Sequence, residues 1–409
     1  MSDVMTVERD ERFGDARVVE IWWNGERVRA VEGQFVYRLT KPAWEEAAMP
    51  SEQILATKGV VGARRSNSRG IGILFAEPDL LERDAGADVI EAPEFEWIEP
   101  LMLDYGCAIN DPHAVDQWAL AEIEAEDAWR LQAKNGRVVL AILDTGVPIL
   151  SSTLSHEDMK ESRINIGPNV LTSGLAIDDH GHGTHVTGIA AASRNNSLGI
   201  AGMWDGDLYV VKVLNDQKAG TSDSFNTGVR NAIEFARSLD AKLVINYSAA
   251  GADGKSKRDA VDQLEQFGAL LVAAAGNQQG GSVQYPAAYA AGRGHVMAIG
   301  AVGSDKKRCA FASRGPELTI AAPGSSILST LPDYSVTMTK AGKSTMYDRT
   351  EGTSQASPLV AAVAAMVWEK HPNLTAKEVR ERIVQTAMPT TESAADVGAG
   401  ILNARRALA

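Results

Sequence analysis

Three residue types that together perform nucleophilic catalysis occur in this chain, each within two positions of a glycine. They are Asp144, which follows the apolar run 138–143, His182 and Ser354. A serine hydroxyl is a poor nucleophile at neutral pH, so it needs an adjacent base, and the base needs a third group that holds its tautomer. Neighbouring glycines permit turns and close backbone approach that bulkier residues forbid. The pattern predicts acyl-transfer chemistry at a site built from Asp, His and Ser.

The segments around these residues predict a parallel sheet. The runs 243–248 and 269–275, like the run before Asp144, are short and mostly apolar. Such runs are typical of strands buried on both faces. Ligands of open α/β sheets bind at the carboxyl ends of the strands. We therefore expect a doubly wound, mostly parallel α/β sheet flanked by helices, with Asp144, Ser248 and Asn277 at one edge.

Three sequence motifs point to a known family. The chain contains D-T-G at 144–146, H-G-T-H-V-x-G at 182–188 and G-T-S-x-A-S-P at 352–358. Each motif alone is weak, but the order Asp, His, Ser distinguishes one of the three unrelated folds that build this triad. The chain resembles the subtilisin-like serine proteases from about residue 110 to residue 409.

The resemblance assigns roles to four residues. Ser354 is the nucleophile, His182 the general base and then acid, and Asp144 the orienting carboxylate. The side-chain amide of Asn277 and the backbone N–H of Ser354 hold the oxyanion. The resemblance implies a serine endopeptidase that hydrolyses peptide bonds through an acyl-enzyme.

Two other functions remain open at this point. A transpeptidase or macrocyclase would use the same triad but pass the acyl group to an amine. A catalytically silent peptide-binding module would keep its cleft occupied by residues near 100.

The resemblance also places substrate contacts on a backbone strip and around a pocket. The family's usual S-L-G-G is Ser-Ala-Ala-Gly here, and Gln278 and Gln284 stand near the first pocket. These polar side chains weaken any prediction of a large aromatic preference. The residues assigned to substrate binding are Ser248, Ala249, Ala250, Gly251, Gly276 and Gln284.

Two metals deserve consideration. His180, His182 and His185 could ligate zinc, but their spacing is not H-E-x-x-H, and zinc would leave Asp144 and Ser354 unexplained.

Calcium is implied by the family's high-affinity site, in which carboxylates, an asparagine oxygen and loop carbonyls bind a hard cation. The alternative is an ordinary Asn-rich turn. The calcium ligands carried over by the match are Asp111, Asp158, Asn196, Leu198 and Ile200.

Composition limits the class of protein. The chain has 409 residues, 44% hydrophobic residues and a formal net charge of -13. This composition suits a large core and two or three domains, and it argues against a nucleic-acid surface. No apolar window approaches the roughly 20 residues that span a bilayer. We expect peptide or protein substrates, and no organic cofactor, nucleic acid or membrane partner.

The amino-terminal segment and the cysteines bear on localisation. Residues 1–14 are dense in charge and contain no apolar segment of the signal-peptide type. Only Cys107 and Cys309 are present, so a disulfide scaffold is not predicted. We expect a cytoplasmic enzyme, with export by a non-classical route as the alternative.

The first hundred residues predict a separate small α+β unit of ferredoxin-like type. Strands are expected at 34–39, 70–75 and about 95–99, with helical stretches at 43–56 and from residue 78. The predicted organisation is a unit at 1–103, a linker and processing region at 104–117, and a protease domain at 118–409.

The family resemblance implies that this unit is a prodomain that acts as folding chaperone and inhibitor. Its carboxyl end would lie in the substrate cleft as an intramolecular partner. The chain is expected to be a zymogen that cleaves itself within 99–111, especially at 102–106. An unrelated interaction domain is the alternative reading.

Overall fold

The computed structural model divides the chain into two compact units, Met1–Tyr105 and Gly106–Ala409. It describes residues 109–159 and 163–409 in full. In the first unit it describes the strands alone, at 6–7, 18–23, 26–39, 60–65, 71–76 and 95–102.

The first unit contains an antiparallel sheet with the order β1-β2-β3-β5-β4, and β6 also pairs with β3. The expected strands at 34–39, 70–75 and 95–99 correspond to parts of β3, β5 and β6, whereas β1, β2 and β4 were not expected. Helices expected at 43–56 and from 78 lie outside the described residues. The strands are β1 (Thr6–Val7), β2 (Val18–Trp23), β3 (Glu26–Leu39), β4 (Val60–Arg65), β5 (Ile71–Ala76) and β6 (Phe95–Met102).

The second unit is built on a seven-stranded parallel sheet with the order β10-β11-β7-β12-β13-β14-β15. The residues of β7 and β14 are buried throughout, as expected for strands covered on both faces. The strands are β7 (Val138–Asp144), β10 (Ile164–Asn169), β11 (Asp207–Lys212), β12 (Lys242–Tyr247), β13 (Leu270–Ala274), β14 (Val296–Val302) and β15 (Ile320–Pro323).

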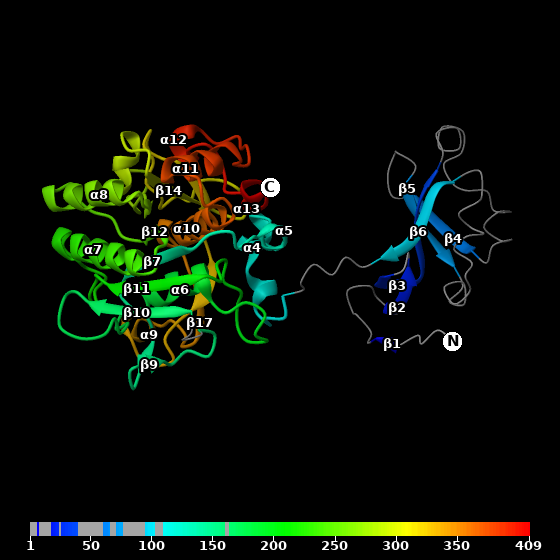
Figure 1. Cartoon of the computed structure of the whole chain (residues 1–409), viewed down its shortest axis with the longest axis horizontal. Coiled ribbons are helices and arrows are strands. Elements are labelled where there is room, and N and C mark those ends of the chain that lie inside the picture. The colour runs from blue at the N-terminus through cyan, green and yellow to red at the C-terminus, as the bar shows by residue number, and fades with distance from the viewer. Residues whose placement is uncertain are drawn as a thin grey trace. The chain divides into compact units, whose positions relative to one another are not determined.

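Helices cover both faces of this sheet (Figure 1). Alternate residues of β7 enter two different cores. Leu140 belongs to the core that includes residues of α6 (His182–Ala191) and α10 (Thr353–Lys370), and Val139 belongs to the core that includes residues of α7 (Ser222–Ser238) and α8 (Lys255–Phe267). The alternation follows from the period of two along a strand. The doubly wound α/β fold predicted from the apolar runs is confirmed.

Shorter elements complete the second unit. Two small hairpins pair β8 with β9 and β16 with β17. The bounds are η3 (Ala114–Asp116), α4 (Trp118–Glu122), α5 (Ala125–Leu131), β8 (Ile149–Leu150), β9 (Thr153–Leu154), η4 (Ala287–Ala291), β16 (Ile327–Thr330), α9 (Thr337–Lys340), β17 (Tyr347–Thr350), α11 (Ala376–Gln385), α12 (Ala394–Val397) and α13 (Ala404–Leu408).

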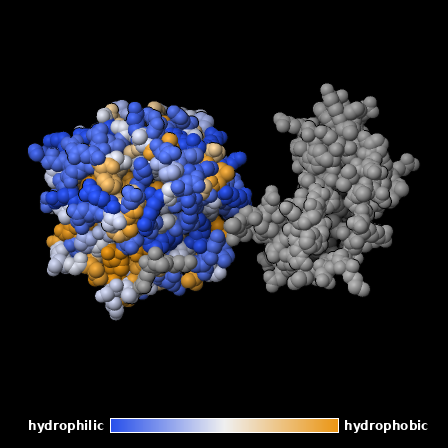
Figure 2. Space-filling view, in the orientation of Figure 1, coloured by the Kyte–Doolittle hydropathy of each residue, from blue (hydrophilic) through white to orange (hydrophobic). Residues whose placement is uncertain are grey.

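The surface of the second unit is mainly hydrophilic on the face in Figure 2, with an apolar region near β9. Leu150, in the strand that pairs with β9, is among the exposed large apolar side chains. Within the part of the chain that the structure describes, no helix has the length and apolar character needed to cross a membrane.

Candidate active site

The carboxyl ends of three neighbouring strands carry the predicted polar residues. Asp144 is the last residue of β7, Ser248 follows β12, and Asn277 lies three residues beyond β13. The strands β7, β12 and β13 are adjacent and parallel, so these three residues lie at one edge of the sheet.

His182 is held by Asp144. His182 is the first residue of α6, and its Nδ1 lies 2.7 Å from Asp144 Oδ1. Both residues are buried, and Asp144 Oδ1 also accepts a hydrogen bond from Thr145 N at 2.8 Å. The carboxylate favours the tautomer with the proton on Nδ1. His182 Nε2 is buried and has no hydrogen-bond partner among the described residues, so it is free to act as a base.

Asp178 fixes the segment that leads into α6, a role that the sequence analysis missed. Its side chain is fully buried and accepts five hydrogen bonds of 2.6–3.0 Å. The donors are the hydroxyl of Thr145, the backbone N–H groups of His180, Gly181 and Thr184, and the hydroxyl of Thr184. A carboxylate is stabilised at a helix amino terminus, because the unpaired N–H groups point toward it. The signal for this role in the sequence was an Asp that stands four residues before the His at the start of the predicted helix.

Ser354 is the second residue of α10 and forms two hydrogen bonds with Ser248, which follows β12. Its Oγ donates to the carbonyl of Ser248 at 3.0 Å, and the Ser248 hydroxyl donates to the Ser354 carbonyl at 2.9 Å. The second bond uses a carbonyl that Pro358 leaves without a helical partner, because proline has no N–H. The motif's proline thus helps to dock the helix on the strand.

No hydrogen bond joins Ser354 Oγ to His182 Nε2 in this structure, because the hydroxyl is directed to the Ser248 carbonyl. Hydrogen bonds between catalytic groups often tighten only in the substrate complex.

A series of hydrogen bonds between buried polar side chains also connects β12 to α10. Asn246 donates from Nδ2 to Ser248 Oγ at 3.0 Å and accepts from Ser357 Oγ at 2.6 Å. All three residues are fully buried, so each hydrogen bond offsets a polar group removed from water. Asn246 was not singled out from the sequence, where it stood as one polar residue inside an apolar run.

Asn277 is oriented by the start of α10. Its Oδ1 accepts from Thr353 N at 3.1 Å and from Thr353 Oγ1 at 3.0 Å. The amide nitrogen is therefore the remaining donor end. A Cβ on Gly352, whose φ is +151°, would lie 3.2 Å from Asn277 Nδ2, so glycine keeps this donor accessible.

The end of the predicted substrate strip pairs with the segment that carries Gln284. Gly251 and Tyr285 exchange two backbone hydrogen bonds, of 2.9 and 3.0 Å. Ala250 is exposed and Ala249 is partly exposed. The Gln284 side chain fills the space beside Gly276, since a Cβ on Gly276 would lie 2.6 Å from Gln284 Oε1.

The other histidines near the site do not form a metal cluster. Burial lowers the pKa of His185 to about 3, and its Nε2 lies 3.2 Å from the Asp348 carbonyl. Burial and the neighbouring His182 lower the pKa of His180. Within residues 109–159 and 163–409, no group of three or more His, Cys, Asp or Glu side chains could hold a metal. The zinc alternative therefore gains no support.

The residues predicted to bind calcium lie together on one loop and its neighbours. Asp111 accepts from the backbone N–H groups of Asn195 and Asn196, at 2.9 and 3.0 Å. Asp158 accepts from Asn196 Nδ2 at 2.9 Å and from Ile200 N at 2.8 Å. The carboxylates thus converge on the loop, although here they face N–H donors.

The carboxyl group of Asp158 is costly to ionise because it is buried. Burial raises the pKa of Asp158 to about 7, against the hydrogen bonds from Ile200 and Asn196, which lower it, and with a smaller upward contribution from the nearby charges. Leu198, whose carbonyl the resemblance also assigned to the metal, lies on the same loop and is exposed. A cation bound here would relieve the cost of ionising Asp158, and the loop carbonyls are oxygen donors of the kind that calcium prefers.

Comparisons with known proteins agree with this geometry. The model of the Subtilase family matches residues 135–403. Over 289 residues the chain is 36% identical to Subtilisin DY of Bacillus licheniformis, covering 70% of this chain and 96% of that protein. It is 31% identical to the halolysin-like extracellular serine protease Nep of Natrialba magadii, covering 73% of this chain and 52% of Nep.

Among solved structures, a protease from Pseudoalteromonas arctica is similar, with a TM-score of 0.62 and 26% identity. The match covers 73% of this chain and 98% of that one.

Proposed function

Since this chain belongs to the Subtilase family and is a serine endopeptidase, we propose that Ser354, His182 and Asp144 form its catalytic triad. The observation that carries this assignment is the 2.7 Å contact between His182 Nδ1 and Asp144 Oδ1 at the sheet edge where α10 docks. It leaves His182 Nε2 as a buried base with no other partner.

The proposed reaction proceeds in two halves. His182 Nε2 takes the Ser354 proton as Oγ bonds to the substrate carbonyl carbon, and Asn277 donates to the resulting oxyanion. The carbon–nitrogen bond breaks as Nε2 returns the proton to the leaving amine, which leaves an ester on Ser354. Water then attacks the ester in the same way and releases the acid.

Substrate is proposed to bind as an extended strand along Ser248–Gly251. The first pocket is shortened by Gln284, which fills the space beside Gly276 and accepts from Gln278 Nε2 at 3.3 Å. The side chain bound there is therefore expected to be small or polar.

A fluorophosphonate probe and product masses test the proposed function together. The probe should label Ser354, since only an activated serine reacts, and peptide products should end in free carboxylates. Products joined to an added amine would instead support ligation or cyclisation. A chain that is folded but unlabelled would be a peptide-binding module.

The first unit is proposed to be an inhibitory chaperone for the second. The separation of the chain into two compact units, the first lying before the family match at 135–403, supports this role. We also propose that the enzyme is cytoplasmic. The Natrialba magadii relative differs in this respect, because its name describes it as extracellular.

Self-processing is expected within 99–111. After prolonged incubation, the wild type should yield a shorter band on a denaturing gel, whereas Ser354→Ala should stay full length because it lacks the nucleophile. Amino-terminal sequencing of the shorter band locates the cut. Identical full-length bands from both proteins would show that the chain does not process itself.

Calcium is proposed to bind through Asp111, Asp158, Asn196 and the carbonyls of Leu198 and Ile200. When bound, it would supply charge compensation for two carboxylates that converge on one loop. Its role would be structural, because the triad residues are not among these ligands.

Chelation should lower the melting temperature by about 5 °C at a saturating starting level of calcium, since a ligand at 100 times its Kd stabilises by about 2.7 kcal/mol. Asp158→Asn should abolish this difference. Asp259→Asn, a carboxylate on the exposed side of α8, should retain it. Equal melting temperatures of the wild type with and without chelator would contradict the site.

A further inference from the structure

Lys212 is a buried cation at the strand end next to Asp144. It is the last residue of β11, is paired in register with Asp144 of β7, and is 2% exposed. Burying an ammonium group is costly unless it is paired and hydrogen-bonded. Lys212 Nζ donates to the Thr145 carbonyl at 2.7 Å and to Asp179 Oδ1 at 2.6 Å, so its position is defined by two contacts.

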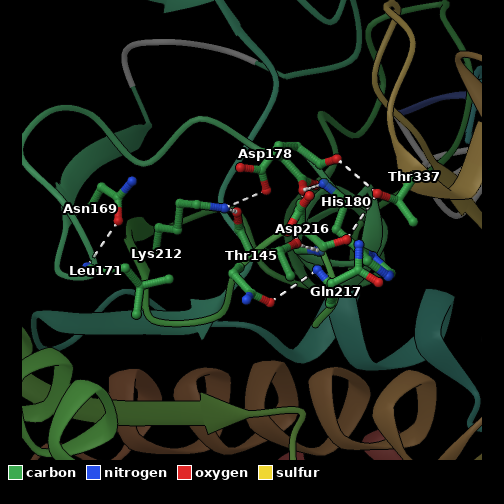
Figure 3. A network of polar contacts seen from close by, with 12 residues as sticks. Thr145, Asn169, Leu171, Asp178, His180, Lys212, Asp216, Gln217 and Thr337 are labelled. Carbon is green, nitrogen blue, oxygen red and sulfur yellow. Dashed lines mark hydrogen bonds and ion pairs between the residues drawn. The ribbon is translucent and has the colours of Figure 1, made fainter. Parts of the chain in front are cut away.

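Those two contacts join the two halves of the Asp144–His182 pair. Thr145 directly follows Asp144, and Asp179 lies three residues before His182. Figure 3 shows Lys212 reaching from its strand toward Thr145, beside the segment that contains Asp178 and His180. The ammonium group therefore links the end of β7 to the segment that leads into α6.

The same segment is held from its other side by the residues that precede and begin α9. The Tyr334 hydroxyl donates to the Asp178 carbonyl at 2.8 Å. Thr337 N donates to the Asp179 carbonyl at 3.2 Å, and Met338 N donates to the His180 carbonyl at 2.9 Å. With its backbone fixed in this way, the segment presents the Asp179 carboxylate to Lys212.

We infer that Lys212 and Asp179 are a positioning pair that sets the placement of Asp144 against His182. The inference rests on the proposed triad. Neither residue is assigned a contact with substrate. The pair acts through Thr145 and through the segment before His182.

The test is the measurement of kcat and KM on a peptide substrate with the full chain. In Lys212→Met, kcat should fall about tenfold with KM changed less than threefold, because the pair orients the base and does not bind substrate. Asp179→Asn should show a smaller fall in kcat, also at nearly constant KM, because it weakens the same link. The double variant should fall no further than Lys212→Met alone, because both residues act through one contact.

Two control variants separate charge and position from general damage. Lys212→Arg keeps the cation and should keep most of the wild-type kcat. Lys242→Met removes a lysine from the opposite end of β12, two strands away from β11, where Nζ lies 5.6 Å from the Trp368 ring, and should leave kcat unchanged. If Lys212→Met does not fold, the fall in kcat of half-exposed Asp179→Asn at constant KM still decides the question.

The inference is overturned if folded Lys212→Met and Asp179→Asn keep the wild-type kcat, or if KM rises as much as kcat falls. Its failure is distinguishable from failure of the proposed function. A wild type that reacts with the fluorophosphonate probe and cleaves peptide, combined with variants of wild-type kcat, removes this inference alone. A wild type that does neither removes the triad assignment.

Discussion

Ser354→Ala is expected to lower kcat about a millionfold and to abolish labelling by fluorophosphonate. The magnitude is borrowed from subtilisins that have lost a triad residue, in which binding and the oxyanion hole sustain the remaining rate. The physical reason is that Ser354 Oγ lies at the start of α10 beside the Ser248 carbonyl, whereas the neighbouring Thr353 hydroxyl is occupied by its hydrogen bond to Asn277 Oδ1. Initial rates on a chromogenic peptide, with trace contamination excluded by the probe, measure the loss.

Ser357→Ala is the matched control for this substitution. Ser357 lies one turn further along the same helix, and its Oγ donates inward to Asn246 Oδ1. Its loss should destabilise the fold by about 1 kcal/mol or more, since Asn246 loses a buried partner, but labelling of Ser354 should persist. Labelling that survives in Ser354→Ala and disappears in Ser357→Ala would reverse the assignment of the nucleophile.

Asn277→Ala is expected to lower kcat by about 10² to 10³ with little change in KM. The magnitude is that found for the oxyanion asparagine of a subtilisin, and is therefore borrowed from a relative. The structure supports the transfer, because Thr353 holds Asn277 Oδ1 with two hydrogen bonds and leaves Nδ2 as the free donor. A donor that acts on the charge developing in the transition state changes kcat and leaves ground-state binding almost unchanged.

Gln278→Ala provides the comparison for Asn277→Ala. Both residues are exposed, but Gln278 directs its amide to Gln284 Oε1. Its removal should alter KM and the preferred side chain while kcat stays within a few-fold. A loss of kcat in Asn277→Ala that is matched by an equal rise in KM would show that Asn277 contributes to substrate binding and not to stabilisation of the oxyanion.

The sequence predicted the sheet and the triad candidates because both leave local patterns. The apolar runs before Asp144 and Asn277 are strands, as their length and flanking glycines indicate. The motif residues His182 and Ser354 begin helices whose amino termini meet the sheet edge. Such features depend on neighbours in the chain, and a single sequence therefore reveals them.

Residues whose roles depend on distant partners were not predicted. Asp178 and Lys212 stood in the sequence as one acid and one base among many, and only the fold brings them to Thr145. The strand β2 was also missed, although Asn24-Gly25 between Trp23 and Glu26 is a strong hairpin signal. The hydroxyl of Ser354 was expected beside the imidazole, and the structure directs it to the Ser248 carbonyl.

The burial of α10 links the loss of activity on heating to the unfolding of the domain core. The helix is buried from Thr353 to Glu369 and contacts the core residues of several strands, so the amides beyond its first turn are expected to exchange with solvent hydrogen only when the surrounding core opens. The nucleophile is thus attached to a segment whose opening requires the core to open. Inactivation and loss of the native state should therefore be a single cooperative event, with no folded but inactive species in between.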